Sequence, residues 1–262
     1  MTSWKKFASL LTLAGLTACS ASPTGRNQLL LFSDKDMSQL GAQSFEQMKK
    51  EQPISKDAKT NAYVQCVANS ITQYIPKQGF SEWEVVVFDS DQVNAFALPG
   101  RKIGVYTGLL KVAVNQDQLA TVIGHEVAHV LADHSNERLS QSQIANTGLS
   151  ITNVALGASE YKQYQGMTMA ALGLGVQYGV ILPYGRTQES EADVVGLEYM
   201  AQAGFDPNQS VNLWQNMAKA SGGNQPPELL STHPSHSTRI KDLQATIKTL
   251  PQSGSLRPNC KA

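Results

Sequence analysis

Residues 121–134 read TVIGHEVAHVLADH and carry two histidines four residues apart, with a glutamate beside the first. Because each residue of an α-helix turns about 100°, His125 and His129 would lie about 40° apart on one face, where both imidazoles can reach one metal ion. Glu126 would lie about 100° from His125, which suits a base acting on metal-bound water rather than a direct ligand. His134 would lie about 140° from His129, and we interpret it as structural.

The surroundings of this histidine pair favour a metal site over a helix that only happens to contain histidines. The preceding stretch, DQLATVIG, is largely apolar, so the motif would lie within a protein core. Burial of two histidines and a glutamate without a partner would be costly, and a zinc ion removes that cost. The H-E-x-x-H pattern also arises by chance, so the missing ligand must be found elsewhere in the chain.

A catalytic zinc usually has three protein ligands and one open position, and the best further ligand lies in RTQESEAD at 186–193. On a helix Glu189 and Asp193 would share one face, about 40° apart. Ala192 and Gly196 fall on the same face, and such small residues would let this helix approach the histidine helix closely. We therefore expect Glu189 to bind the metal and Asp193 to orient a ligand histidine by accepting its other ring N–H. The alternative is a solvated acidic face.

The elements that must position these residues are mostly helical. Apolar spacing predicts helices over about 34–50, 56–75, 116–134, 136–160, 186–203, 208–220 and 236–249. Residues 83–89, WEVVVFD, predict a strand, and 94–110 predicts two short strands around a Pro99–Gly100 turn. The sequence therefore predicts an α+β fold that is mostly helical, with a small sheet.

The stretch 166–182, GMTMAALGLGVQYGVIL, contains no charged residue and many glycines and alanines. A second membrane anchor is one interpretation. However, its short length, its glycines, Gln177 and Tyr178 make it a weak transmembrane signal. We expect a buried or lid-forming helical segment instead.

The N-terminal residues indicate export and lipid attachment. Two lysines precede an apolar core at 7–16, which is too short to span a bilayer. This core is followed by LTAC, ending at Cys19, and resembles the lipobox of bacterial lipoproteins. The resemblance implies cleavage of a signal peptide, 1–18, and lipidation of Cys19. In a Gram-negative bacterium, Ser20 at the next position implies the periplasmic face of the outer membrane. The alternative is an ordinary secretory signal cleaved near Ala21.

Charge and cysteine content narrow the function further. The chain has 21 basic and 21 acidic side chains and no basic block, so nucleic-acid binding is poorly supported. Besides Cys19, the chain contains Cys66 and Cys260, which could form one disulfide in an oxidising compartment. Two free thiols are the alternative, since spacing alone cannot establish distance.

The combination of HEVAH and ESEAD, about sixty residues apart, is similar to the motif pair of M48 zinc metallopeptidases, the Ste24/HtpX/Oma1-like group. The Oma1-like bacterial lipoproteins fit best. Three further segments carry the resemblance: TGRNQLLLFSDKDMSQLGAQSF (24–45), NAFALPGRKIGVYTGLL (94–110) and STHPSHSTRI (231–240). Arg101 departs from the family, in which a second glycine commonly follows Pro-Gly; we expect no loss of function.

This resemblance implies a gluzincin-like metallopeptidase domain whose small sheet packs beside the HExxH helix. We expect that domain over 34–250, preceded by an extended leader, 19–33, and followed by a C-terminal tail, 251–262.

The resemblance also implies a mechanism. One zinc ion held by His125, His129 and Glu189 would lower the pKa of its water toward ~7, and Glu126 would take the proton and deliver it to the leaving amine. His233 would stabilise the oxyanion or bind zinc in a resting enzyme; a surface histidine is the third interpretation.

Two arginines and one strand complete the expected site. Arg186 precedes the Glu189 helix and could reach the site, and Arg239 is expected to pin the C-terminal loop through an ion pair. The strand 93–98 is a candidate edge that binds an extended peptide, with Asn94 and Ala95 closest to the scissile bond.

Binding through the main chain discriminates weakly between side chains. We therefore predict an endopeptidase that cleaves unfolded or misassembled envelope proteins. The membrane would be contacted through the lipid on Cys19. The alternative is a non-catalytic zinc lipoprotein that acts as an envelope chaperone or assembly factor.

Overall fold

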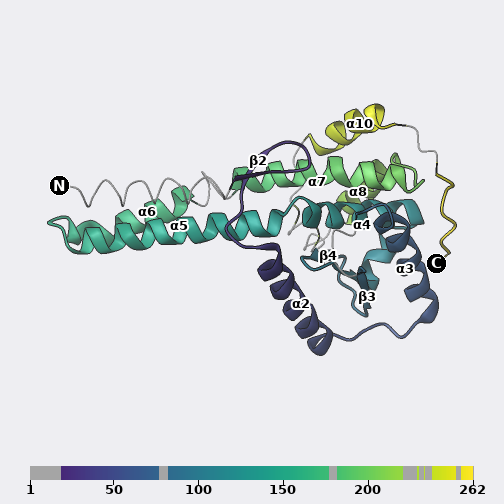
Figure 1. The fold of residues 1–262 in the computed structure, drawn as a ribbon, viewed down its shortest axis with the longest axis horizontal. Coiled ribbons are helices and arrows are strands. Elements are labelled where there is room, and N and C mark those ends of the chain that lie inside the picture. Colours follow the sequence, from purple (N-terminus) through teal and green to yellow (C-terminus); the bar gives the residue numbers. More distant parts are fainter. Residues whose placement is uncertain are drawn as a thin grey trace. The chain divides into compact units, whose positions relative to one another are not determined.

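Figure 1 shows the computed structural model of the chain, in which residues 19–76, 82–176, 182–220, 229, 233, 238–251 and 255–261 are described. The expected signal peptide, 1–18, lies outside these residues. The chain divides into two compact units: Met1–Ser33 with Asp133–Thr187, and Asp34–Ala132 with Gln188–Ala262. The leader boundary after residue 33 coincides with a unit boundary, whereas the stretch 34–250, expected as one domain, contributes to both units.

The second unit contains a three-stranded sheet formed by the β-branched and aromatic segments that predicted strands. Its strands are β3 Glu84–Phe88, β4 Ala95–Leu98 and β5 Lys102–Tyr106, in the order β3-β5-β4. β5 pairs in parallel with β3 and antiparallel with β4, so β4 lies at one edge of this sheet. The prediction of a small sheet in a mostly helical fold is confirmed.

The turn between β4 and β5 places two consecutive residues in the left-handed region of backbone conformation. Gly100 has φ 82° and Arg101 has φ 62°, both in the left-handed region that favours glycine. The Arg101 side chain is buried; its Nη2 donates to Pro76 O at 2.5 Å, and its guanidinium lies 5.8 Å from the Trp83 ring. These contacts hold an arginine in a glycine-like conformation.

Helices surround this sheet. The second unit contains α2 Asp34–Glu51, α3 Ala58–Thr72, the 3-10 helix η1 Thr107–Lys111, α4 Gln116–Leu131, α8 Gln209–Ala220 and α10 Arg239–Thr249, and α7 Leu182–Gln202 runs through the boundary between the units. The α4 helix begins after Asn115, whose side chain accepts a hydrogen bond from Gln118 N at 2.9 Å. This cap satisfies a backbone donor that the first turn would otherwise leave unpaired.

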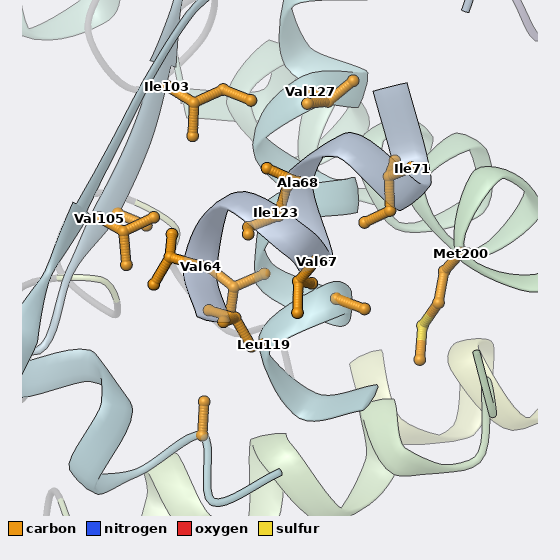
Figure 2. Packing of buried hydrophobic residues seen from close by; sticks show 14 of the residues in the cluster. Val64, Val67, Ala68, Ile71, Ile103, Val105, Leu119, Ile123, Val127 and Met200 are labelled. Atoms are coloured by element: carbon orange, nitrogen blue, oxygen red, sulfur yellow. The ribbon is translucent and has the colours of Figure 1, made fainter. Parts of the chain in front are cut away.

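The core of the second unit is built around α4. Figure 2 shows buried side chains of α3, α4, α7 and β5 packed together: Val64, Val67, Ala68, Ile71, Leu119, Ile123, Val127, Met200, Ile103 and Val105. The α4 helix also contacts β4 and α8. Because neighbours enclose α4 on several sides, its side chains are held in fixed positions.

A disulfide joins two distant segments of this unit. Cys66 on α3 is bonded to Cys260, with Cα atoms 5.7 Å apart across a sequence separation of 194 residues. Of the two interpretations left open by the sequence, the structure has the bonded pair. Gln116 adds polar contacts, since its Oε1 accepts from Cys260 N and its Nε2 donates to Pro258 O, each at 2.8 Å.

In the first unit the leader forms a hairpin rather than a simple extended segment. β1 Cys19–Ala21 pairs antiparallel with β2 Asn27–Leu29. Between them, Arg26 donates from both Nη atoms to the Glu137 carboxylate at 2.6 and 2.8 Å. Glu137 belongs to α5 His134–Gly157 and is 1% exposed, so Arg26 supplies the partner that a buried carboxylate needs.

Further hydrogen bonds fix the leader to the first two turns of α5. Leu31 N donates to Ser140 Oγ at 2.9 Å, and Asn136 Nδ2 donates to Phe32 O at 2.7 Å. The leader is therefore a folded part of this unit. The sequence did not indicate this hairpin or its contacts, because the polar groups on α5 that fix it lie far from it in sequence.

The segment after α5 returns as a second helix. Following η2 Lys162–Tyr164, α6 Gln165–Val176 packs along α5, and Figure 1 shows the two helices side by side. Residues 166–176 of the predicted stretch are helical, as expected, and 177–181 lie outside the described residues. Burial, one of the two interpretations, is wrong for residues 166–172, which are exposed or only partly buried, and a lid-forming role stays a prediction. Within the described residues, no helix is both long and apolar enough to cross a membrane.

Candidate metal centre

Close packing of α4 and α7 brings the two predicted motifs together. A Cβ on Gly124 would lie 2.8 Å from Gly196 O, and one on Gly196 would lie 2.8 Å from His125 N, so neither position has room for a side chain. Ala192 is fully buried beside this contact. The small face expected on α7 therefore lies against α4, and Glu189 is carried to the histidines.

Four donor atoms converge at this contact. One atom each from His125, His129, Glu189 and His233 lies within 4.8 Å of all the others. His125 Nε2 lies 3.1 Å from His129 Nε2, 3.3 Å from Glu189 Oε2 and 3.2 Å from His233 Nδ1. Glu189 Oε1 lies 3.4 Å from His129 Nε2 and 3.0 Å from His233 Nδ1.

These distances test whether zinc fits the residues. Ligands about 2.0–2.1 Å from a tetrahedral zinc are separated from one another by about 3.3–3.4 Å. The measured separations of 3.0–3.4 Å are close to that value. Imidazole nitrogens and a carboxylate oxygen are also usual zinc donors. The donor types and their close approach therefore fit a zinc site.

The charges of the site support the same conclusion. Burial opposes ionisation of Glu189, but hydrogen bonds from three imidazoles hold its pKa well below its usual range. Burial lowers the pKa of His129 well below its usual value. Burial also acts to lower the pKa of His125, but hydrogen bonds to Asp193 and Glu189 outweigh it and raise that pKa to about 9. An ionised carboxylate ringed by imidazoles provides the negative charge and lone pairs that a buried cation needs.

Asp193 lies on the far side of His125 from the donor cluster. Its Oδ1 is 3.0 Å from His125 Nδ1, while His125 Nε2 faces the other donors. A carboxylate at Nδ1 fixes the ring orientation and keeps the lone pair of Nε2 directed at the metal. The structure thus places Asp193 where the sequence expected an orienting residue.

Glu126 is buried beside the cluster without being one of its donors. Its Oε1 has no hydrogen-bond partner and lies 3.3 Å from His233 Nε2. Burial raises the pKa of Glu126, although its electrostatic interactions with the neighbouring imidazoles and a hydrogen bond from the Ala97 backbone act in the opposite direction. A buried, partly unsatisfied carboxylate next to a metal is suited to accept a proton from a bound molecule.

The comparison with known families agrees with this chemistry. A model of peptidase family M48 matches residues 56–247. The chain belongs to peptidase family M48. Zinc is the metal of this family, and the resemblance found in HEVAH and ESEAD is therefore confirmed.

Curated relatives of this M48 chain include mitochondrial metalloendopeptidases. It is 32% identical to OMA1 of Bos taurus over 278 residues, covering 98% of this chain and 52% of that protein. It is 33% identical to OMA1 of Schizosaccharomyces pombe over 181 residues, covering 68% and 51%. It is 27% identical to the beta-barrel assembly-enhancing protease of Escherichia coli O157:H7 over 209 residues, covering 78% and 42%. The chain spans about half the length of the curated relatives it matches.

The edge strand β4 of the M48 chain lies against α4. Asn94 O accepts from Tyr106 N, so antiparallel alternation points the backbone groups of Ala95 and Ala97 away from β5. Ala97 N–H donates to Glu126, and Ala95 N–H donates to Asn94 Oδ1 at 3.0 Å. Asn94 and Ala95 thus lie on the expected edge, but the strand residue in contact with Glu126 is Ala97. Binding of a peptide at this edge stays a prediction.

Arg239 makes contacts that sequence reasoning missed. The sequence suggested that it pins the C-terminal loop through an ion pair with an unidentified partner; the side chain is 1% exposed and reaches α7. Its Nη2 donates to Asp193 Oδ1 at 2.7 Å and its Nη1 to Glu189 Oε2 at 3.3 Å. Its guanidinium lies 3.6 Å from the centre of the Trp214 ring, a cation–π contact. The sequence offered only one arginine in STHPSHSTRI, and nothing in that segment indicates which residues the arginine contacts.

The remaining expected residues lie outside this cluster or remain untested. Arg186 is exposed on α7, and a role beside the zinc ligands stays a prediction. The backbone of Cys19 belongs to β1, and its lipidation is likewise a prediction. An apolar cavity adjoins the donors, lined in part by Thr121, Val122, Leu197, Leu213, Trp214 and Leu243.

Proposed function

We propose that this chain is a zinc-dependent endopeptidase that cleaves unfolded or misassembled proteins of the cell envelope. The observation that carries the proposal is the position of Glu126. Its buried carboxylate lies beside four converging metal donors, on the helix that supplies two of them, and has an oxygen without a hydrogen bond. A site that only held zinc for stability would not need this group.

The roles of the side chains follow from their contacts. Zinc, when bound, lowers the pKa of water and polarises a peptide carbonyl. Glu126 would accept the water proton and deliver it to the leaving amine. Asp193 and Arg239 would hold His125 in position, because both act on the side of that ring opposite the metal. The edge of β4 would align the peptide through main-chain hydrogen bonds.

His233 would define a resting state of the enzyme. Its Nδ1 takes the fourth donor position, which a substrate carbonyl would otherwise use. We propose that this side chain leaves the donor cluster when a peptide binds. The displaced His233 would then stabilise the oxyanion. This combines the two roles that the sequence left open, zinc binding at rest and oxyanion stabilisation.

The proposed substrate class rests on the edge strand and on the relatives. Pairing along β4 would select an extended main chain rather than a particular sequence, as unfolded proteins offer. A beta-barrel assembly-enhancing protease is among the similar proteins, which supports a role in the envelope. We further propose that lipid on Cys19 attaches the protein to the periplasmic face of an outer membrane.

The decisive experiment compares wild type with Glu126→Gln for zinc content and for cleavage of unfolded casein. Glu198→Gln, an exposed position on α7, is the matched control. We expect one zinc per chain in all three proteins, cleavage by wild type and control, and a loss of at least about 100-fold in Glu126→Gln. Stoichiometric zinc together with cleavage that does not depend on Glu126 would reject the proposed mechanism.

One observation favours a second candidate, a non-catalytic zinc lipoprotein that assists envelope assembly. Four protein donors surround the centre, as is usual for structural zinc rather than catalytic zinc. Under this alternative, the Glu126→Gln variant would fully complement a strain from which the gene is deleted. The endopeptidase proposal predicts that the same variant fails to complement, although it retains zinc.

A further inference from the structure

The helical hairpin formed by α5 and α6 exposes many large apolar side chains to solvent. Within residues 141–176 they include Ile144 (47%), Ile151 (66%), Val154 (73%), Tyr161 (59%), Tyr164 (50%), Met167 (70%) and Leu172 (40%). Single exposed apolar residues are ordinary, but a concentration of them on one element marks an interaction surface.

Charge is almost absent from the same segment. Charged residues make up 16% of the chain, yet between Gln141 and Val176 the sequence contains Glu160 and Lys162 alone. Solvated helices normally keep charged side chains on their outer face. The exposed surface of this hairpin therefore combines large apolar side chains with uncharged polar ones and offers little to a strongly charged partner.

The exposed apolar residues of α5 form a stripe on one side of the helix. At 100° per residue, Ile144 lies about 20° and Val154 about 60° from Ile151. The partly buried residues Leu149 and Leu156 lie about 140–160° from Ile151, on the opposite side. Since α6 packs along α5, the stripe belongs to the side that this packing leaves uncovered.

We propose that the α5–α6 hairpin docks on a membrane surface, with Ile151, Val154 and Met167 inserted at the boundary between lipid headgroups and acyl chains. The apolar faces of helices bind this boundary through the burial of apolar area. Tyr161, Lys162 and Tyr164 at the turn have the amphipathic side chains that favour the same region. The Ile144–Val154 stripe runs along the helix rather than at its tip, which favours a hairpin lying flat on the bilayer.

The position of the leader favours a lipid surface over a soluble partner. The strand that begins at Cys19 is tied to the first turns of α5 by Arg26 and Glu137, within one compact unit. If Cys19 is lipidated, the hairpin and the site of lipid attachment belong to one compact unit. The proposed contact itself does not require lipidation, zinc or Glu126, and so goes beyond the peptidase function.

A vesicle-flotation experiment tests the proposal. The full chain carrying Cys19→Ser, which removes the lipidation site, is mixed with phosphatidylcholine vesicles. It is compared with the same chain carrying Ile151→Asn, Val154→Asn and Met167→Gln. A matched control replaces three apolar residues exposed elsewhere, with Leu40→Gln, Val114→Asn and Leu256→Gln. Circular dichroism and zinc content verify that all three proteins are folded.

We expect the hairpin substitutions to lower the vesicle partition coefficient at least about tenfold and the control substitutions to change it less than about twofold. Binding should hardly depend on salt or on added phosphatidylglycerol, because the charges of Glu160 and Lys162 cancel. Equal partitioning of the parent and the hairpin variant would overturn the proposal. So would a dimer that the hairpin substitutions abolish, without vesicle binding by the parent, since that result assigns the surface to a second copy.

A spectroscopic measurement makes the test independent of these substitutions. In the Cys19→Ser chain, Cys66 and Cys260 are bonded to each other. Val154→Cys therefore adds a free thiol that can carry an environment-sensitive dye. Vesicles should shift the dye emission to the blue at position 154 but not in a Val114→Cys control. Unshifted emission at position 154 would also overturn the proposal.

Discussion

Arg239 Nη2 lies 2.7 Å from Asp193 Oδ1, and the same oxygen lies 3.0 Å from His125 Nδ1. This ion pair is buried behind the metal centre, where a second contact from Arg239 reaches Glu189. One arginine thus neutralises the carboxylate that orients a histidine and also contacts the carboxylate among the metal donors.

Replacing Arg239 should therefore weaken the metal centre. Arg239→Met leaves Asp193 without its cation in a buried position, so we expect zinc affinity to fall about 10–100-fold and stability to fall by about 3–5 kcal/mol. Competition with a zinc chelator and denaturant unfolding measure the two effects. Lys241→Met, an exposed change on the same helix, is the control and should alter neither. Unchanged zinc affinity in Arg239→Met would show that the arginine does not support the metal centre and only stabilises the C-terminal loop.

Gly196→Ala should separate α7 from α4. The added Cβ would approach His125 N to 2.8 Å, and backbone on both sides limits relaxation. We expect a destabilisation of about 1–3 kcal/mol from overpacking, accompanied by weaker zinc binding because Glu189 moves with α7. Gly185→Ala is the control, since its Cβ meets nothing within 4 Å. A zinc affinity equal to that of wild type would disprove the link between helix spacing and the metal.

Loss of the disulfide should lower stability without removing the zinc ligands. Cys66→Ser with Cys260→Ser opens a covalent loop of 194 residues, and we expect unfolding free energy to fall by about 2–5 kcal/mol. Denaturant titration measures this change. A reducing agent should reproduce it in wild type and have no further effect on the double variant. If reduction destabilises both proteins equally, the effect comes from another source.

Zinc removal should loosen the second unit. Glu189 and three histidines converge within 4.8 Å, so the bound metal stabilises the folded state through its affinity. We expect a chelator to lower the melting temperature of wild type, and Glu189→Gln to melt at a lower temperature that the chelator hardly changes. Differential scanning calorimetry with zinc added back checks this. Recovery of wild-type melting by Glu189→Gln in equimolar zinc would contradict the ligand assignment.

Local periodicity predicted the parts of the site that lie on helices. His125 and His129 share a face because they are four residues apart, and the same reasoning applies to Glu189 and Asp193. The close approach of the two helices was visible in Ala192 and Gly196. These inferences required only helical periodicity and the assumption that the two helices pack against each other.

The contacts that the sequence did not predict are all non-local. His233 lies in a stretch without periodicity, so only the family resemblance suggested it as a zinc ligand, and its role was left open. The partners of Arg239 lie on α7, and they become apparent only from the tertiary structure, in which Arg239 of α10 reaches that helix. The hairpin of the leader was missed because its buried partners, including Glu137, lie more than a hundred residues away.

The expected burial of α6 failed for a different reason. An uncharged, apolar segment is usually covered by protein, and composition does not tell which surface covers it. The structure leaves residues 165–172 accessible instead.

The disulfide also orders the events that make the protein. Cys66 and Cys260 enclose every metal donor, along with Glu126, Asp193 and Arg239. Covalent closure can therefore follow only after all of these residues have been synthesised and have reached a compartment that oxidises thiols. A chain kept under reducing conditions would carry the complete metal centre on a less stable scaffold, so its maturation would be completed only in an oxidising compartment.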